Sequence, residues 1–201
     1  MADRRTIAAY DLRVDDYVRL TKRTKPHETL IQFIARVRPG GYVLDLGCGP
    51  ANASAVMRDH GLRVDAVDAS EEMVRLANDT HDIDARVATF DDIDMPEAYD
   101  GIWANFSLLH AEPADFPRYL SALHRALVLG GVFHIGMKLG DGEARDRLDR
   151  FYAYYSRNEL LEHLTGAGFD IDRIVTGEDP GLAGDIEPWI AVTAWSKPDT
   201  L

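Results

Sequence analysis

The sequence lacks several features that would assign it to a familiar class. Its one cysteine, Cys48, excludes an internal disulfide framework. No apolar run approaches the roughly 20 residues needed to cross a bilayer, and residues 1–17 lack the continuous apolar core of a secretory signal. The histidines form no H-x-x-x-H pair and there is no C-x-x-C pair, so no metal site is indicated. We therefore expect a cytoplasmic protein without a membrane partner or a metal.

Basic residues are also scarce. Lys and Arg number 22 against 34 Asp and Glu, which gives a formal net charge of -12. Such a surface repels phosphates at long range, so the composition disfavours nucleic acid and favours a small molecule as partner. The densest basic stretches are RLTKRTK (19–25) and RDRLDR (145–150), which we interpret as solvated helix faces. Nothing in the sequence indicates an oligomeric state.

The 201 residues suit one domain, 1–201, with no internal repeat and no linker. Residues 1–38 are expected to be helical and to precede the first strand. Short β-branched runs predict five strands, with helical segments between them, at 42–46, 63–69, 84–90, 99–106 and 130–138. Strands that alternate with helices favour a parallel sheet covered on both faces.

The last part of the chain breaks that alternation. Two strands are predicted at 169–177 and 189–196, joined by residues 178–188, whose Gly, Pro and acidic residues indicate a loop. Two strands without a helix between them favour an antiparallel pair. The fold class is therefore α/β: a doubly wound, mostly parallel, seven-stranded, Rossmann-like sheet with an antiparallel last strand.

Three helix boundaries are predicted between the strands. Ser70 has the position of an N-cap. Gly130 and Gly131 are expected to stop the helix that begins near Phe116. Ser156 and Glu159 have the spacing of a capping box.

The stretch VLDLGCGPANAS (43–54) predicts a strand that turns into a helix close to a ligand. A nucleoside-triphosphate loop needs Gly-Lys-Ser/Thr, but Ala-Asn-Ala follows Pro50 here. The dinucleotide pattern G-x-G-x-x-G fails at Asn52, and the carboxylate of Asp45 would repel a pyrophosphate. S-adenosylmethionine has no phosphate, and a carboxylate can hold its sulfonium and ammonium cations. Asp68, at the end of the second strand, has the position of a ribose-binding acid, although it could instead cap the next helix.

These motifs also carry a resemblance. VLDLGCG followed by VDAVDASEEMVRLA resembles the first two motifs of class I S-adenosylmethionine-dependent methyltransferases, in particular the small bacterial type that acts on small molecules. The likeness continues through YDGIWANFSLLH, HRALVLGGVFHIGM and YYSRNELLEHLTGAGF, and covers about residues 40–196. One departure is Ala51, where the family often has a third glycine. The resemblance implies a transferase with S-adenosyl-L-methionine as cofactor and a small-molecule methyl acceptor.

The family pattern implies roles for particular residues. Around the methionine part of the cofactor it places Asp45, Gly47, Cys48 and Gly49; Asp68 binds the ribose. Ala69 and Met73 flank the adenine, although Met73 could equally be core. The positions that contact the edge of the adenine are Phe90, Asp91 and Asp92, although the two acids could instead belong to a solvated turn. Asn105 through His110 follow the fourth strand, so the ANFSLLH stretch (104–110) is placed to border the methyl group and the acceptor.

The catalytic assignments have alternatives of their own. His110 is the candidate general base, or else a packed loop histidine. His134 is expected in the core. Residues that could line the acceptor pocket, or pack as aromatic structure, are Lys138, Tyr152 and Tyr155. Tyr10 and Tyr17 belong to the segment 1–38, which could close as a lid or staple its helix to the domain.

A second hypothesis assigns the same fold to a protein without catalytic activity. A binding module for S-adenosylmethionine, or a partner subunit with this fold, also accounts for the motifs, because no residue is decisively catalytic. A nicotinamide-dependent reductase is disfavoured by Asp45 and Asn52.

Overall fold

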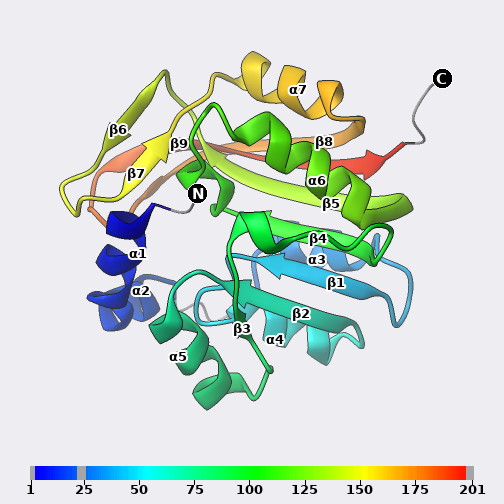
Figure 1. Ribbon diagram of the computed structural model, residues 1–201, viewed down its shortest axis with the longest axis horizontal. Coiled ribbons are helices and arrows are strands. Elements are labelled where there is room, and N and C mark those ends of the chain that lie inside the picture. The colour runs from blue at the N-terminus through cyan, green and yellow to red at the C-terminus, as the bar shows by residue number, and fades with distance from the viewer. Residues whose placement is uncertain (1–2, 22–25, 198–201) are drawn as a thin grey trace.

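The computed structural model describes residues 3–21 and 26–197 and is built around one seven-stranded sheet (Figure 1). The strand order is β3-β2-β1-β4-β5-β9-β8. Parallel pairing joins β1 to β2 and β4, β2 to β3, and β4 to β5, whereas β9 runs antiparallel to both β5 and β8. The strands are β1 (Tyr42–Leu46), β2 (Arg63–Asp68), β3 (Arg86–Val87), β4 (Tyr99–Asn105), β5 (Leu127–Lys138), β8 (Phe169–Pro180) and β9 (Ile186–Ser196). The predicted fold class is confirmed.

Helices cover both faces of this sheet. They are α1 (Arg4–Asp11), α2 (Val14–Thr21), α3 (Glu28–Ile34), α4 (Asn52–Asp59), α5 (Glu71–His81), α6 (Phe116–Ala126) and α7 (Arg157–Gly166), with short 3-10 turns at Phe90–Asp92 and Leu108–His110. One apolar cluster joins α3 and α4 to the sheet through Phe33, Met57 and Trp103. A larger cluster on the other face contains Leu120 of α6 and Leu164 of α7. The described part of the segment 1–38 is mostly helical, with turns or irregular backbone at 12–13, 26–27 and 35–38.

Two predicted helix starts are confirmed. The hydroxyl of Ser70 accepts a hydrogen bond from Met73 N at 3.0 Å. Ser156 and Glu159 form a reciprocal capping box. Each bond satisfies a backbone N–H that has no partner inside its own helix.

The predicted role of the glycine pair was wrong. Helix α6 ends at Ala126, and Gly130 and Gly131 lie inside β5. Leu127 already pairs with Tyr99 of β4, and the register then shifts before Gly101. Gly130 has a φ of +75°, which suits a bulge, so these glycines serve the sheet.

Two predicted strand boundaries also need correction. Only Arg86–Val87 of the run 84–90 forms a strand, because β3 is an edge strand that pairs with β2 alone. The region 178–188 is not one loop, since β8 reaches Pro180 and β9 starts at Ile186. Paired backbone groups here extend the hairpin despite the Gly, Pro and acidic residues.

The basic stretch 145–150 is not a helix face. Strand β6 (Glu143–Arg145) pairs antiparallel with β7 (Phe151–Ala153), and the residues between them form a turn. Arg150 is only 3% exposed, because its charge is neutralised by Asp146. Of the other basic stretch, residues 22–25 lie outside the described part of the chain. In the described ranges, no helix is long and apolar enough to cross a membrane.

Candidate functional site

The turn after β1 needs its glycines. Gly47 has a φ of +78°, and a Cβ added there would lie 2.4 Å from the Cβ of Ser107. Gly49 has a φ of +52° and faces the ring of Tyr17. The amides of Gly47 and Cys48 both donate to Val67 O at 2.9 Å, which fixes the turn against the end of β2. Any side chain at Gly47 would displace this turn.

Asp68 is held at the same edge of the sheet. One carboxylate oxygen accepts from Gly49 N at 2.8 Å, and the other accepts from Ser70 N at 2.9 Å. Burial raises the pKa of Asp68 above its usual value. A carboxylate has about four acceptor positions, so two backbone bonds leave capacity for a ligand hydroxyl. Both interpretations of Asp68, as a structural cap and as a ligand-facing acid, fit this geometry.

Ala51 occupies a conformation that normally requires glycine. Its φ is +58°, in the left-handed region, and it is the residue before α4. An L-residue there costs roughly 1–2 kcal/mol. Its methyl group is fully buried in a cluster with Ala66 and Ala77, which offsets part of this cost. Ala51 therefore adopts a backbone conformation that a glycine would adopt without this strain.

A small cavity of about 100 Å³ lies beside the glycine turn. It brings together many of the residues predicted from the sequence: Tyr10, Tyr17, Gly47, Gly49, Asp68, Ala69, Met73, Phe90 and His110. Met73 is 2% exposed, so it is at once a core residue and part of the cavity wall.

A larger cavity of about 790 Å³ adjoins the first. Its walls include the predicted residues Asp45, Cys48, Asn105, Lys138 and Tyr152. Both cavities share Tyr10, Tyr17, Gly47 and Phe106, so these residues form the boundary between them.

Asp45 is almost fully buried at the base of the larger cavity. Ser54 Oγ donates to its carboxylate at 2.6 Å. Burial raises the pKa of Asp45 to about 7, since the low-dielectric surroundings penalise the charged form. A cationic ligand group beside Asp45 would favour its ionised form.

Three of the predicted residues line neither cavity. Asp91 pairs with Arg118 at 2.7 Å, and Asp92 accepts from Thr89 at 2.8 Å. Tyr155 stacks on Phe116 with ring centroids 4.8 Å apart. For Tyr155 the structural interpretation, packing against the last helix, is confirmed by its contact with His163 of α7. The adenine contact of Asp91 or Asp92 stays a prediction.

His110 lies at the end of the Leu108–His110 turn. Its Nδ1 is 2.6 Å from Phe151 O, and its Nε2 is 2.9 Å from the hydroxyl of Tyr10. A carbonyl can only accept, so Nδ1 carries the hydrogen and Nε2 accepts from Tyr10. Burial lowers the pKa of His110 to about 4, which keeps the ring neutral near pH 7. Arg150 donates to the same Tyr10 hydroxyl at 3.1 Å. His134, by contrast, is buried in the core and stacks on Trp103, as expected.

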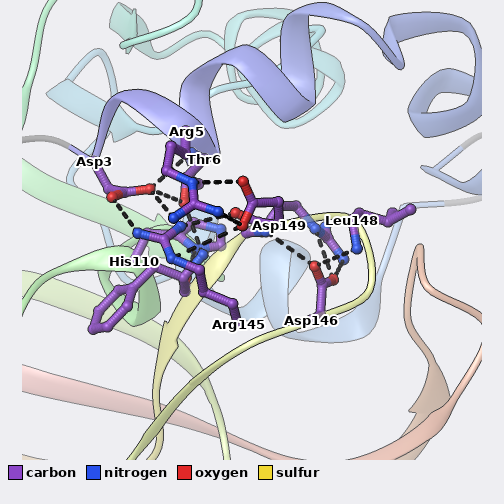
Figure 2. A network of polar contacts seen from close by, with 10 residues as sticks. Asp3, Arg5, Thr6, His110, Arg145, Asp146, Leu148 and Asp149 are labelled. Carbon is purple, nitrogen blue, oxygen red and sulfur yellow. Dashed lines mark hydrogen bonds and ion pairs between the residues drawn. The ribbon is translucent and has the colours of Figure 1, made fainter.

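Helix α1 is fastened over the small cavity by polar contacts, which Figure 2 shows. Arg145 binds Asp3 through two bonds of 3.0 and 2.7 Å. Arg5 binds Asp149 through bonds of 2.6 and 2.5 Å. Thr6 Oγ1 accepts from the amide of Phe151 at 2.8 Å. Tyr10 therefore fits both of its interpretations. Its helix is held to the domain by these bonds, and the same helix covers a cavity.

Sequence reasoning missed several residues of this region. Arg150 gave no signal, because the run of charges around it is typical of a solvated surface. Phe106 and Ser107 lie in the ANFSLLH stretch, which the sequence places beside the methyl group without assigning a role to either residue. Phe106 has a φ of +59° and borders both cavities. Ser107 borders the small cavity, and its buried Oγ has no hydrogen-bond partner among the described residues. Within those residues, no three His, Cys, Asp or Glu side chains group as metal ligands would.

Comparisons with known proteins agree with this arrangement. The family described as "Methyltransferase domain" matches residues 43–131. An uncharacterized methyltransferase of Staphylococcus carnosus is 33% identical over 125 residues, which are 62% of this chain and 60% of the relative. The chain spans 46% to 60% of the length of the curated relatives it matches.

Two solved structures share the fold. A 1,6-didemethyltoxoflavin-N1-methyltransferase of Burkholderia thailandensis, solved with its substrate and S-adenosylhomocysteine, has a TM-score of 0.69 and 24% identity, with 96% of this chain and 88% of that chain covered. An S-adenosylmethionine-dependent methyltransferase of Methanosarcina mazei has a TM-score of 0.76 and 17% identity, with 87% and 100% covered. Residues 43–131 therefore match a methyltransferase domain family, and the chain shares the Rossmann-like fold of solved S-adenosylmethionine-dependent methyltransferases.

Proposed function

We propose that this chain is an enzyme that transfers the methyl group of S-adenosylmethionine to a small-molecule acceptor. The observation that carries the proposal is the pair of adjoining cavities at the glycine turn, of which the smaller contains the Asp68 carboxylate. Two cavities with a shared boundary suit a cofactor and an acceptor whose reacting atoms must meet. The structural neighbour from Burkholderia thailandensis holds two such ligands.

The residues at the turn fit this cofactor. Asp68 can accept from ribose hydroxyls while it stays bonded to Gly49. The adenine would lie between Ala69, Met73 and Phe90. The methionine part would follow the turn formed by Gly47, Cys48 and Gly49, and its ammonium group would face Asp45. We assign Asn105 to the region of the methyl group, since it ends β4 and lines the larger cavity.

A ligand of this size needs more room than the small cavity has. Ligand pockets measure about 300–1,000 Å³, whereas this cavity holds about 100 Å³. The side chains of Tyr10 and Tyr17 form one side of it. We therefore propose that α1 and α2 of the N-terminal segment 1–38 act as a lid of the single domain 1–201, with α3 held in the core, and that α1 moves away when the cofactor enters.

The proposed chemistry is an in-line displacement. S-adenosylmethionine supplies the electrophilic methyl group when bound. The acceptor atom forms the new bond to carbon while the carbon–sulfur bond breaks and its electron pair stays on sulfur. An acceptor with an O–H or N–H must also lose a proton. We assign its removal to His110 acting through Tyr10: the Tyr10 hydroxyl oxygen takes the proton of the acceptor while its own hydrogen passes to the neutral Nε2 of His110.

Calorimetry with S-adenosylmethionine and S-adenosylhomocysteine tests the cofactor site. We expect saturable binding by the native protein and a loss of about tenfold or more for Asp68→Ala, because a hydrogen bond to a charged group contributes about 1.5–3 kcal/mol. Asp170→Ala is the matched control, since Asp170 pairs with Lys197, belongs to the edge strand β8 and lines neither cavity. Absence of binding to folded native protein, or equal binding by Asp68→Ala, contradicts the proposal.

The second hypothesis predicts cofactor binding without transfer to any member of a broad acceptor panel. The pairing of a neutral histidine with Tyr10 at the cavity boundary favours the enzyme. The cytoplasmic location and the preference for a small molecule over nucleic acid stay predictions from the sequence.

A further inference from the structure

The larger cavity has an aromatic wall. Trp103, Phe106, Tyr152 and Trp189 all line it. The rings of Phe106 and Trp189 stand edge to face, with centroids 6.3 Å apart. Indole and phenyl rings around a cavity bind flat, unsaturated ligands well, because stacked and edge-to-face contacts add to the burial of apolar surface.

Two buried basic side chains lie together in the wall of this cavity, although the whole chain is strongly acidic. The Lys138 Nζ lies 3.7 Å from the centroid of the Tyr152 ring, and the Arg150 guanidinium carbon lies 5.2 Å from the same centroid. The side chains of Lys138 and Arg150 are 12% and 3% exposed. Two buried cations beside one ring require negative charge nearby.

The two cations are neutralised in different ways. Arg150 directs two nitrogens to Asp146, which does not line the cavity, and a third to the Tyr10 hydroxyl. Lys138 pairs instead with Glu187 of β9, which does line the cavity. An ammonium group has three donors, so Lys138 can bind a second carboxylate beside Glu187, or exchange Glu187 for it.

We propose that the methyl acceptor is a planar aromatic acid whose carboxylate binds Lys138 and whose ring packs against Tyr152 and Trp189. This inference rests on the proposed function and adds the chemical class of its substrate. A single negative charge fits, because Asp146 already neutralises Arg150. A phosphate dianion on Lys138 would be repelled by the carboxylate of Glu187 about twice as strongly as the single charge of a carboxylate.

The test uses matched pairs of ligands on three ring systems. Hydroxylated benzoic, naphthoic and indole carboxylic acids are each compared with the carboxamide of the same scaffold. Binding is measured by calorimetry on full-length protein saturated with S-adenosylhomocysteine. We expect at least one acid to bind saturably at millimolar concentration or below, and to bind about tenfold or more tightly than its amide.

Two variants assign the preference to this lysine. Lys138→Met keeps an unbranched side chain of similar length and removes the charge. The acid and its amide should then bind within about twofold of each other. Glu187→Gln removes the competing carboxylate and should strengthen binding of the acid. Lys197→Met is the control, because Lys197 pairs with Asp170 away from both cavities. Melting temperatures and binding of S-adenosylhomocysteine establish that each variant is folded.

The remaining outcomes overturn the inference. They are equal or tighter binding of the amides, an acid preference that survives in Lys138→Met, or no binding of any acid by protein that binds S-adenosylhomocysteine. The last outcome leaves the proposed cofactor site standing. Failure to bind S-adenosylhomocysteine overturns the proposed function itself, so the two failures are distinguishable.

Discussion

The hydroxyl of Tyr10 and the Nε2 of His110 lie 2.9 Å apart, although 100 residues separate them in the sequence. This hydrogen bond joins helix α1 to the turn that follows the central strand β4. It lies at the boundary of the two cavities, where a methyl group and its acceptor would meet. The bond therefore links closure of the N-terminal segment to the orientation of the proposed base.

Removing the Tyr10 hydroxyl tests this link. Tyr10→Phe keeps the ring in both cavity walls but loses the bonds to His110 and Arg150. We expect methyl transfer to slow by about 10²-fold or more, the typical contribution of a positioned acid or base, with binding of S-adenosylhomocysteine within threefold of native. His110→Gln should slow transfer to a similar degree. A single-turnover assay with an accepted substrate measures both, and unchanged rates in both variants contradict a role for this pair.

The buried histidine also makes stability depend on pH. Its pKa is about 4 in the folded protein, below the value near 6.5 of an unfolded histidine, so the unfolded chain binds more protons in this window. Neutral His110 therefore stabilises the fold fully above about pH 6.5, and this stability is lost as the pH falls toward 4. The difference in unfolding free energy between native protein and His110→Gln should shift against the native protein over that window. Urea unfolding at several pH values measures it, and a difference that is constant with pH contradicts the account.

The pKa of Asp45 shifts upward, so its effect on stability has the opposite pH dependence to that of His110. The pKa of Asp45 is raised to about 7, above the unfolded value near 3.9, so the folded protein binds more protons between these values and the fold loses stability as the pH rises from about 4 to about 7. Asp45→Asn keeps an acceptor for Ser54 Oγ and cannot ionise. We expect the variant to be more stable than native protein by more than about 1 kcal/mol near pH 8, and to show little difference near pH 4. It should also bind S-adenosylmethionine more weakly, because the proposed ammonium contact is lost. Equal stability of the two proteins at both pH values contradicts the buried position of Asp45.

The ion pairs of α1 predict how fast the cofactor leaves. Arg145→Ala removes two bonds to Asp3, whose pKa they hold below its usual value. We expect faster hydrogen exchange in residues 3–11 and faster dissociation of S-adenosylhomocysteine, by severalfold, because a partly exposed ion pair contributes about 1 kcal/mol or less. Arg36→Ala is a matched control, since Arg36 pairs with Asp172 at similar exposure outside both cavities. The lid assignment is wrong if both variants release the ligand at the native rate.

Because its backbone is left-handed, Ala51 should tolerate substitution by valine much less well than its neighbour Ala53 does. Valine branches at Cβ and is strongly disfavoured at a φ of +58°, and no space surrounds this buried methyl. We expect Ala51→Val to lower the free energy of unfolding by more than about 2 kcal/mol, whereas Ala53→Val inside α4 should cost about 0.5 kcal/mol. Ala51→Gly should change stability little, because relief of strain is offset by the lost methyl group. Similar costs for the two valine variants would contradict the observed turn.

The sequence predicts the sheet well because each strand carries a local signal. β-Branched runs and caps at Ser70 and Ser156 depend on neighbours within a few residues. The glycine turn was identified for the same reason, since its glycines serve a local change of direction. The role of Gly130 was missed because the register of β5 against β4 is a long-range property.

The same distinction between local and long-range signals applies to the residues of the candidate site. Residues at strand ends, such as Asp45 and Asp68, could be predicted because parallel strands place their ends together. Arg150 could not, since its burial depends on Asp146 and on Tyr10 from the N-terminal helix. The adenine contact of Asp91 or Asp92 comes from the family resemblance and stays a prediction; in the structure Asp91 binds Arg118 and Asp92 accepts from Thr89.

A structure with S-adenosylhomocysteine bound tests the central claim most directly. The account predicts that both ribose hydroxyls lie within hydrogen-bond distance of the Asp68 carboxylate, with the adenine against Met73 and Phe90 and the sulfur facing the larger cavity. A ligand whose ribose contacts other residues, or whose sulfur points away from the boundary at Tyr10, would contradict it.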